Sequence, residues 1–568
     1  MARLLETLLP GLCSQPIQVL EVLLALTLVA ILRIRRQWLS PLAGVWRRLE
    51  PHPVRLLTGL AAGLLLTHVA LEWNQPRRAP AVHDEFGYLL TAETFLEGKF
   101  TNPTPPDWRA LETIHVNFVP SYNSMYPPGQ PLLLAAAWRA LGHPIHANWV
   151  LAPLLGLGTW WMAAAWIPRR WALLGGTLVA LRLGLFGYWS ESYMGGALPT
   201  LCALAFAGAL PRFLRRPSIA LVVSAGLALG LMFSVRPFEA VVLGVCSVPV
   251  PWLLGSRAGV RDLLIRSIPG IVVFALVIGA VAAHNVQLTG APGRFGYDLN
   301  MERHGYGMFP GSRTRGTEPD VTPHLAGFYE ETRRYTAYSW TPGGFVGTRL
   351  RSLGWSWVFL IGPLFTVGCL HWRRSLWVGR LRPALPGLLV FWVVLAANSW
   401  SSAHYYSGAF GYVLVFALTG LRLWCVRHRV PASHAAGATL AAAATVVLIR
   451  IVGGAATVSA PSIPIDWLPY YTPPGLEDRR TLEQALTKAD PALVFVRYGP
   501  NESVRRDWVY NRPDPTRAHV VWANDLGPAI NAQTARTYAR RRWHCIEIVT
   551  GRPRRSDCAT WIASTSNQ

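Results

Sequence analysis

The feature that most constrains this chain is a series of apolar runs, each about as long as a membrane span, which recurs from near the N-terminus to about residue 453. Hydrophobic residues make up 51% of the 568 residues, and charged residues only 15%. A run of about 20 apolar residues can cross the hydrocarbon layer as a helix. The sequence therefore predicts a mainly α-helical, polytopic membrane protein with one polar tail.

The lengths of the apolar runs predict about twelve spans. They fall at Ile17–Ile34, Val54–Trp73, Ile145–Ile167, Trp171–Trp189, Ala197–Phe213, Ser218–Val235, Glu239–Leu254, Ile268–Leu288, Leu353–Leu370, Ala384–Trp400, Tyr406–Val426 and Ala432–Val452. The segment Pro131–Leu141 is apolar but too short to span, so we interpret it as an interfacial or re-entrant helix.

The basic residues predict how these spans are oriented. The net charge is +23, and many of the basic residues form short clusters between apolar runs, at 33–36, 168–170, 212–216, 371–374 and 427–429. Clusters of this kind mark cytoplasmic loops. This pattern argues against nucleic-acid binding and places the N-terminus outside, although the first run could instead be a signal-like segment that is not cleaved.

The opposite, extracytoplasmic side then receives the polar connections. They are the loop His83–Pro131, the turns WSESYMGG and RPFEA, the loop Gly290–Arg351 and the tail. We therefore predict a transmembrane domain over 1–458, with outer loops at 83–131 and 290–351. A soluble α/β domain is expected over 459–568.

Short runs rich in β-branched and other apolar residues predict strands in the tail at PALVFVRYG, AHVVWAND, HCIEIV and CATWIA, with a helix at NAQTARTYARR. The last two strands would form a hairpin around a GRPRRSD turn, with Cys545 and Cys558 facing each other. In an oxidising exterior these two cysteines would form a disulfide; the alternative is a pair of buried thiols.

Two adjacent carboxylates, Asp84 and Glu85, follow the second span. Charges at a membrane boundary are costly unless they are solvated, paired or used. Because neighbouring side chains diverge, one can face a cavity while the other binds backbone or a cation. An apolar wall would raise the pKa of Asp84 towards a value suited to a general base. The alternative is that Asp84 caps a helix that begins at Phe86.

Several other ionisable residues are expected on the outer side. Arg236 could bind a phosphate or could pair with Glu239, three residues on. The further candidates are Glu191, Arg303, His304 and His404. The sequence contains no HExxH, CxxC or DxD metal motif and no phosphate-binding glycine loop, so we predict no metal ligands. A divalent cation between a donor phosphate and Asp84 or Glu85 remains possible.

An ordered series of motifs carries a family resemblance. The stretches HDEFGYLLTAETFLEGKFTNPTPPDW, SYNSMYPPGQPLLLA, YWSESYMGGALPTL, RPFEA and HNVQLTGAPGRFGYDLNMERHGYG occur in this order. The series resembles bacterial family-39-like membrane glycosyltransferases, which are related to protein O-mannosyltransferases and aminoarabinose transferases. The resemblance implies a C-type glycosyltransferase fold and a polyprenyl-phosphate sugar donor bound between helices. It also implies that an acidic residue in the first outer loop acts as base or orients the acceptor.

The resemblance implies roles for particular residues. The acidic pair of the family falls on Asp84 and Glu85, with Asp84 as the candidate base. The substrate- or phosphate-binding residues implied by the remaining motifs are His115, Tyr126, Arg236, Glu239, His404 and Tyr405. Relatives commonly have a lysine before the Tyr-Pro-Pro motif, where this chain has Met125. The positive charge near the donor phosphate would then come from Arg236 or His115.

The sequence thus predicts an enzyme of the bacterial cytoplasmic membrane that transfers a sugar, with inversion, from a polyprenyl phosphate to a hydroxyl of an envelope glycan, lipid or protein. Two other classes are possible. A transporter of lipid-linked saccharides predicts internal repeats and charged or broken helices at mid-membrane. A non-catalytic envelope scaffold predicts that the candidate residues are scattered.

Overall fold

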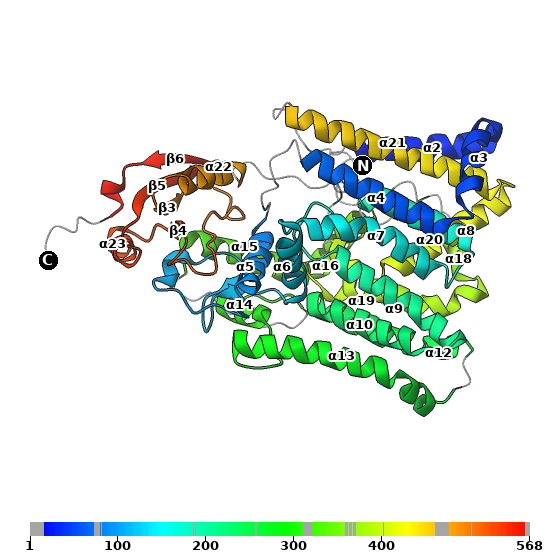
Figure 1. Ribbon diagram of the computed structural model, residues 1–568, viewed down its shortest axis with the longest axis horizontal. Coiled ribbons are helices and arrows are strands. Elements are labelled where there is room, and N and C mark those ends of the chain that lie inside the picture. The colour runs from blue at the N-terminus through cyan, green and yellow to red at the C-terminus, as the bar shows by residue number, and fades with distance from the viewer. Residues whose placement is uncertain are drawn as a thin grey trace.

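The computed structural model describes residues 16–72, 80, 82–185, 187, 189–255, 258–309, 321–357, 362, 366, 371–400, 403–459, 476–500 and 502–562. A bundle of long helices forms one part of the molecule, and a small sheet lies at the other end (Figure 1). Between them lies a layer of shorter helices that includes α5, α14 and α15.

Helices of the bundle cover at least part of eleven of the twelve predicted apolar runs. Its elements are α2 (Pro16–Ile34), η1 (Arg36–Leu39), α3 (Ser40–Leu49), α4 (Pro53–Glu72), α7 (His146–Ala163), α8 (Arg169–Leu183), α9 (Ala197–Arg215), α10 (Ile219–Val235), α11 (Pro237–Ser247), α12 (Val250–Leu253), α13 (Val260–Thr289), α18 (Trp372–Leu376), η4 (Gly379–Ala384), α19 (Leu385–Ala397), η5 (Ala403–Tyr406), α20 (Phe410–Arg427) and α21 (Ala432–Ser459).

Five of the described helices are long and apolar enough to cross a membrane, and four further apolar helices are shorter. The window of α13 that could span is only 11% buried, so this helix presents an apolar surface at the edge of the bundle (Figure 1). Such a surface is expected where lipid replaces water. Most of the span predicted at Leu353–Leu370 lies outside the described residues.

The span predicted at Glu239–Leu254 is interrupted. The structure divides it into α11 and the four-residue α12. Pro249 and Pro251 lie at and just after the break. Proline lacks a backbone N–H, so a continuous helical hydrogen-bond ladder is not maintained there.

The basic clusters gather at the end of the bundle farthest from the sheet, where α3, α12 and α18 are seen in Figure 1. The Arg36 guanidinium donates to the carbonyl of Arg429 at 2.8 Å. Arg212 is close enough to Arg169 and Arg215 to interact with their charges. Clusters far apart in the sequence therefore share one end of the bundle.

The first outer loop contains α5 (His83–Leu96), η2 (Trp108–Leu111), β1 (Val116–Asn117), β2 (Asn123–Ser124) and α6 (Gly129–Leu141). The two short strands are antiparallel, with Val116 opposite Ser124. The 13-residue α6 agrees with the short helix predicted at Pro131–Leu141. The second loop contributes α14 (Gly296–His304), α15 (Pro323–Ser339) and α16 (Pro342–Ser356).

The C-terminal segment forms a four-stranded sheet in the order β4-β3-β5-β6. Its elements are α22 (Leu476–Thr487), β3 (Ala492–Tyr498), β4 (Val520–Asn524), α23 (Pro528–Thr537), β5 (Arg542–Val549), β6 (Arg552–Ser556) and η6 (Cys558–Thr560). Strand β3 is parallel to β4 and β5, and β6 is antiparallel to β5.

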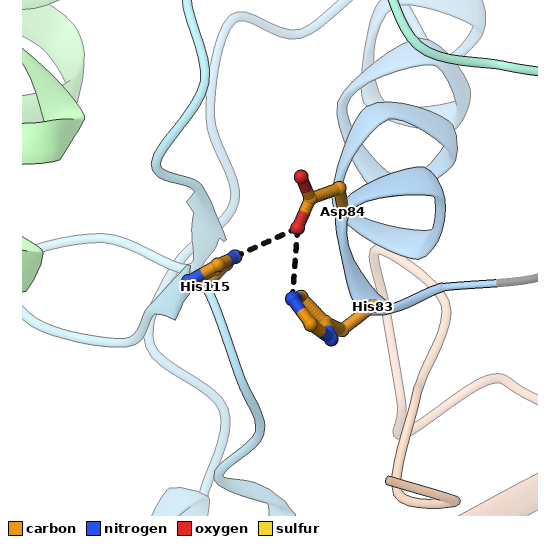
Figure 2. Close-up of side chains that lie close together, drawn as sticks. All are labelled: His83, Asp84 and His115. Carbon is orange, nitrogen blue, oxygen red and sulfur yellow. Dashed lines mark hydrogen bonds and ion pairs between the residues drawn. The ribbon is translucent and has the colours of Figure 1, made fainter. Parts of the chain in front are cut away.

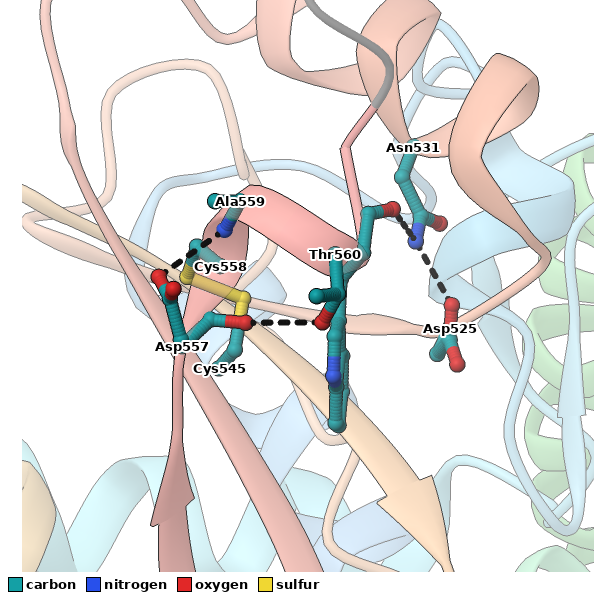
Figure 3. Close-up of a disulfide and its surroundings, with 8 residues drawn as sticks. Asp525, Asn531, Cys545, Asp557, Cys558, Ala559 and Thr560 are labelled. Carbon is teal, nitrogen blue, oxygen red and sulfur yellow. Dashed lines mark hydrogen bonds between the residues drawn. A yellow bond between two sulfur atoms is a disulfide. The ribbon is translucent and has the colours of Figure 1, made fainter.

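The last strand is not where the sequence pattern predicted it. Strand β6 occupies the arginine-rich segment that was predicted as a turn, whereas Cys558 begins the short helix η6. Because β6 is an edge strand, its polar side chains face solvent and hide the strand pattern. The disulfide Cys545–Cys558 is nevertheless formed (Figure 3), and it ties η6 to β5.

The C-terminal segment and the first outer loop share one hydrophobic core. Leu90, Leu111 and Phe118 belong to the same buried cluster as Leu493 and Phe495 of β3. The Asn524 amide also donates to the backbone carbonyls of Ala110 and Glu112. The sheet therefore supports the loop that carries Asp84.

Candidate active site

Helix α5 positions the acidic pair. Its N-cap is Val82, which makes no side-chain cap hydrogen bond, and Asp84 and Glu85 lie in the first turn. The alternative of Asp84 as the cap is therefore wrong. Carboxylates in the first turn are stabilised by the positive end of the helix dipole.

The two carboxylates diverge, as predicted. Glu85 is buried, and its Oε1 accepts a hydrogen bond from the backbone N–H of Tyr193 at 2.8 Å. Glu85 thus joins α5 to the WSESYMGG turn. Asp84 points instead towards His115, which directly precedes β1 (Figure 2).

Asp84 lies at a convergence of polar side chains that we call the Asp84 centre: His83, Asp84, His115 and Tyr126. Asp84 Oδ1 lies 3.0 Å from His83 Nε2 and 2.9 Å from His115 Nδ1. Its other oxygen points away from both rings (Figure 2). Tyr126 Oη lies 2.8 Å from His115 Nδ1. The sequence neighbour His83 and two residues from further along the loop, His115 and Tyr126, thus meet around one carboxylate.

The backbone at His115 adopts an unusual conformation, with φ at 60°. A histidine in this left-handed region requires support from its surroundings. The backbone N–H of His115 donates to Tyr329 Oη at 3.1 Å, and its carbonyl accepts from Met125 N–H at 3.1 Å. Phe328 packs edge-on against the rings of both His83 and His115. Helix α15 therefore fixes the orientation of both imidazoles.

Close packing brings α5 against the second strand of the loop. A Cβ atom on Gly87 would lie 2.8 Å from Ser124 Oγ and 3.3 Å from the Tyr126 ring. One turn of the helix after Asp84, Tyr88 stacks on Tyr126 with ring centroids 4.4 Å apart. The absence of a side chain at Gly87 therefore lets the Tyr-Pro-Pro motif approach Asp84.

The pKa of Asp84 differs from the expectation. Burial raises it, but the charges and hydrogen bonds of His83 and His115 hold the pKa well below the usual range of an aspartate. The predicted raised pKa is thus wrong, because the wall beside Asp84 consists of imidazoles. Burial lowers the pKa of His115, and Asp84 offsets this only in part. At neutral pH the pair is a carboxylate beside a neutral imidazole.

Arg236 lies between α10 and α11 and is only 6% exposed. Its guanidinium carbon lies 4.9 Å from the centroid of the Tyr405 ring. Its Nε is buried and has no hydrogen-bond partner among the described residues. Glu239, in the first turn of α11, is buried beside it and interacts with it electrostatically. We call Arg236, Glu239, His404 and Tyr405 the Arg236 cluster.

The Asp84 centre and the Arg236 cluster are close enough to influence the same groups. Burial raises the pKa of Tyr405 to about 12 and lowers that of His404 well below its usual value. The charges of Arg236 and Asp84 both act on the pKa of each of these groups and on that of Tyr88. The carboxylate and the guanidinium therefore act in one polar neighbourhood.

Met125 occupies the position where relatives commonly have lysine. It is buried, and its sulfur lies 3.7 Å from Tyr306 Oη. Arg236 is the buried arginine that shares the electrostatic neighbourhood of Asp84. It is thus the stronger of the two candidates for the charge that Met125 cannot supply.

Three of the sequence-predicted residues have other partners. Arg303 Nε donates to Glu112 Oε1 at 2.8 Å, and its guanidinium lies over the Trp108 ring. Glu191 lies 3.4 Å from His68 of α4. His304 stacks on Tyr329 and so supports the residue that holds the His115 backbone.

Sequence reasoning missed His83, Tyr88, Phe328 and Tyr329. His83 directly precedes the acidic pair, which was a usable signal. The other three gave none, because their roles depend on contacts between segments far apart in the chain.

The structure also assembles a possible metal-ligand set. Ligand atoms of His83, Asp84 and His115 all lie within 4.8 Å of one another. No contiguous metal-binding motif in the sequence indicated this set, because His115 lies 31 residues after Asp84.

The opposite face of α5 borders a separate cleft of about 400 Å³ between the first outer loop and the C-terminal segment. Its lining includes Phe86, Glu93, Arg479 and Tyr510. Phe86 and Tyr510 stack with centroids 3.8 Å apart. We call the lining of this cleft the docking face, and Asp84 is not part of it.

A comparison with protein families found no matching family model, and a comparison with curated proteins found no match. Among solved structures, this chain is similar to ArnT from Cupriavidus metallidurans. The apo structure has 12% identity, covers 87% of this chain and 92% of its own, and gives a TM-score of 0.48. ArnT bound to undecaprenyl phosphate has 13% identity, the same coverage and a TM-score of 0.46.

The Archaeoglobus fulgidus oligosaccharyltransferase in complex with Zn and sulfate is also similar. It has 13% identity, covers 86% of this chain and 67% of its own, and gives a TM-score of 0.45. These neighbours include an aminoarabinose transferase, one of the groups that the motif series resembles.

Proposed function

We propose that this protein is a membrane glycosyltransferase that moves a sugar from a polyprenyl-phosphate donor to an acceptor hydroxyl. The observation that carries the proposal is the convergence of the Asp84 centre and the Arg236 cluster. An ionised carboxylate and a buried guanidinium share one neighbourhood. Transfer from a lipid phosphate needs a group that accepts a proton and a cation that stabilises the departing phosphate.

Arg236 is the candidate for the phosphate end of the donor. A guanidinium presents several N–H donors in one plane and matches the oxygens of a phosphate. Burial strengthens such an interaction because little water competes. The Arg236 Nε atom, which has no hydrogen-bond partner among the described residues, is a donor that the phosphate would satisfy.

Asp84 is the candidate base, as predicted from the sequence. In this mechanism the acceptor oxygen attacks the anomeric carbon from the face opposite the phosphate, the new C–O bond forms, and the bond to the phosphate oxygen breaks. The acceptor proton passes to Asp84, and the polyprenyl phosphate departs as an anion beside Arg236. The product has inverted configuration at the anomeric carbon.

The low pKa of Asp84 sets the timing of proton transfer. A weakly basic carboxylate does not remove a proton from a resting hydroxyl. It accepts the proton as the oxygen becomes acidic during bond formation, and this assistance contributes about 10²–10⁴ in rate. Positioning of the acceptor and stabilisation of the phosphate supply the rest.

The arrangement of charges supports an extracytoplasmic site. The basic clusters share the end of the bundle farthest from the sheet, whereas Asp84 lies on α5, between the bundle and the sheet (Figure 1). Under the positive-inside rule the basic end is cytoplasmic. The acidic site and the disulfide-bonded C-terminal segment then face the exterior of the cytoplasmic membrane, where disulfides persist.

The same arrangement disfavours the other two classes. A scaffold predicts scattered ionisable residues, yet Asp84, His115, Arg236 and His404 are gathered. A transporter predicts functional charges near the middle of the bundle. These four residues lie instead in the outer loop and in the connections between helices.

The test measures transfer from a radiolabelled polyprenyl-phosphate sugar by the purified full-length protein. We expect Asp84→Asn to lower turnover by about 10²–10⁴-fold. Glu93→Gln is a matched control, because Glu93 is a carboxylate on the opposite face of the same helix. Near-normal turnover by folded Asp84→Asn protein would refute the assignment of the base.

A further inference from the structure

We propose that the Asp84 centre binds one divalent transition-metal ion through His83, Asp84 and His115. Two imidazole nitrogens and one carboxylate oxygen form the ligand set, and the three atoms lie within 4.8 Å of one another. Three protein ligands that leave open coordination positions are typical of catalytic rather than structural metal sites. The role given to the ion below rests on the proposed function, whereas its binding does not.

The spacing of the ligand atoms suits a small ion. Two ligands of a tetrahedral zinc ion, each about 2.05 Å from the metal, are about 3.3 Å apart. Asp84 Oδ1 lies 3.0 Å from His83 Nε2 and 2.9 Å from His115 Nδ1. These two contacts are a few tenths of an ångström shorter than the ligand spacing around zinc, and the two imidazole nitrogens lie within 4.8 Å of each other.

The rings are held in this orientation by their surroundings. The Phe328 ring packs edge-on against His83 at a centroid distance of 5.1 Å and against His115 at 5.5 Å. Tyr329 and Met125 hold the His115 backbone at its positive φ. Outer groups that orient metal ligands in this way are a general feature of metal sites.

The ligand types indicate which ions would bind. Imidazole nitrogens favour zinc, cobalt and related transition metals over magnesium and calcium, which prefer oxygen ligands. Tyr126 Oη, 2.8 Å from His115 Nδ1, lies beside the proposed position and could support a metal-bound ligand.

A metal ion here would supply positive charge next to the donor phosphate. That charge would complement Arg236 and replace the lysine absent at position 125. The ion would occupy the Oδ1 side of Asp84, while the oxygen that points away from both imidazoles would remain for the acceptor (Figure 2).

The test is direct and uses metal alone. The full-length protein, purified in detergent and stripped with a chelator, is titrated with Co²⁺ while its visible absorption is recorded. Bound Zn²⁺ is counted by elemental analysis. We expect one ion per chain and the absorption of Co²⁺ with nitrogen and oxygen ligands. His83→Asn and His115→Asn, made separately, should each weaken binding by about 100-fold or more.

His519→Asn is the matched control, because His519 is an exposed histidine whose Nε2 contacts the carbonyl of Ala489. If both site variants unfold, the Co²⁺ spectrum of the wild-type protein tests the proposal. Absorption typical of nitrogen ligands supports the site, and absorption of Co²⁺ with oxygen ligands alone contradicts it. Absence of binding to the wild-type protein, or equal binding by the His519 and site variants, would overturn the proposal. No substrate is used, so this failure is separate from failure of the transfer assay.

Discussion

The two faces of α5 contain similar residue types but are organised differently. On one face, Asp84 and Tyr88 meet imidazoles, a tyrosine and the field of Arg236. On the other, Phe86 and Glu93 border the docking face of the C-terminal segment, where Arg479 is anchored. Residues one helical turn apart share a face, so a shift of two positions changes the environment of a side chain.

The comparison shows that burial and charge alone do not identify a site. Arg479 is as deeply buried as Arg236. However, its nitrogens donate to the carbonyls of Trp508 and Tyr510 and to Glu483. Arg236 retains a donor without a hydrogen-bond partner among the described residues. The difference in satisfied donors separates a structural arginine from a candidate ligand-binding one.

The largest expected effect contrasts these two arginines. Arg236→Gln should lower turnover by about 10²–10³-fold, because a group that stabilises the departing phosphate is removed. Arg479→Gln should instead lower the free energy of unfolding by about 2–3 kcal/mol, because charged hydrogen bonds are lost. Transfer assays and thermal unfolding of both variants measure the contrast. Equal effects of the two substitutions on turnover would contradict the separation of Arg236 from the structural Arg479.

Next in size is the loss of an aromatic contact on the docking face. Phe86→Ala removes the stacking on Tyr510 and should destabilise the docked C-terminal segment by about 2 kcal/mol, since Phe86 is half-buried. Limited proteolysis would detect faster cleavage of that segment. Phe100→Ala, at a residue that is 59% exposed, serves as the control. Unchanged protease resistance of the Phe86 variant would contradict the role of this face.

A smaller effect should link the two faces. Asp507 accepts hydrogen bonds from Thr113 Oγ1 at 2.8 Å and from the backbone N–H of Ile114 at 3.4 Å, directly before His115. Asp507→Asn should lower kcat by about tenfold, with little change in KM, because His115 is displaced slightly. Asp514→Asn, which changes only a local turn, should retain kcat. A kcat equal to that of the Asp514 variant would show that the hydrogen bonds of Asp507 to Thr113 and Ile114 do not position His115.

The smallest expected effect concerns pH. Burial raises the pKa of Glu93, Glu483 and Glu97 raise it further, and Arg512 opposes them. The folded protein thus holds this proton more tightly than the unfolded chain. The contribution of Glu93 to stability is greatest below its unfolded pKa and is lost as the pH rises through the raised folded pKa.

Glu93→Gln should therefore raise the free energy of unfolding at neutral pH by less than about 1 kcal/mol, and this gain should vanish in acid. Thermal unfolding across that pH range, with Glu97→Gln as the control, measures the difference. A gain that does not depend on pH would refute the stated cause.

Local sequence patterns identified most of the helices and three strands of the tail. Apolar runs give the helices because their length matches the membrane. The apolar runs of β3 and β4 are visible because those strands are buried almost throughout, and the second half of β5 is partly buried in the same way. The edge strand β6 was missed for the opposite reason, since four of its five residues are polar or charged. The disulfide was predictable because its cysteines lie only 13 residues apart, beside strand β5.

The sequence alone determined that Asp84 and Glu85 lie together after a span, and that their side chains diverge. Only the tertiary structure decided that Asp84 meets two imidazoles while Glu85 holds a backbone N–H. It also decided the direction of the Asp84 pKa and separated the roles of the two buried arginines. The physical reason is that these properties depend on charges and hydrogen-bond partners contributed by residues tens to hundreds of positions away, which no local pattern records.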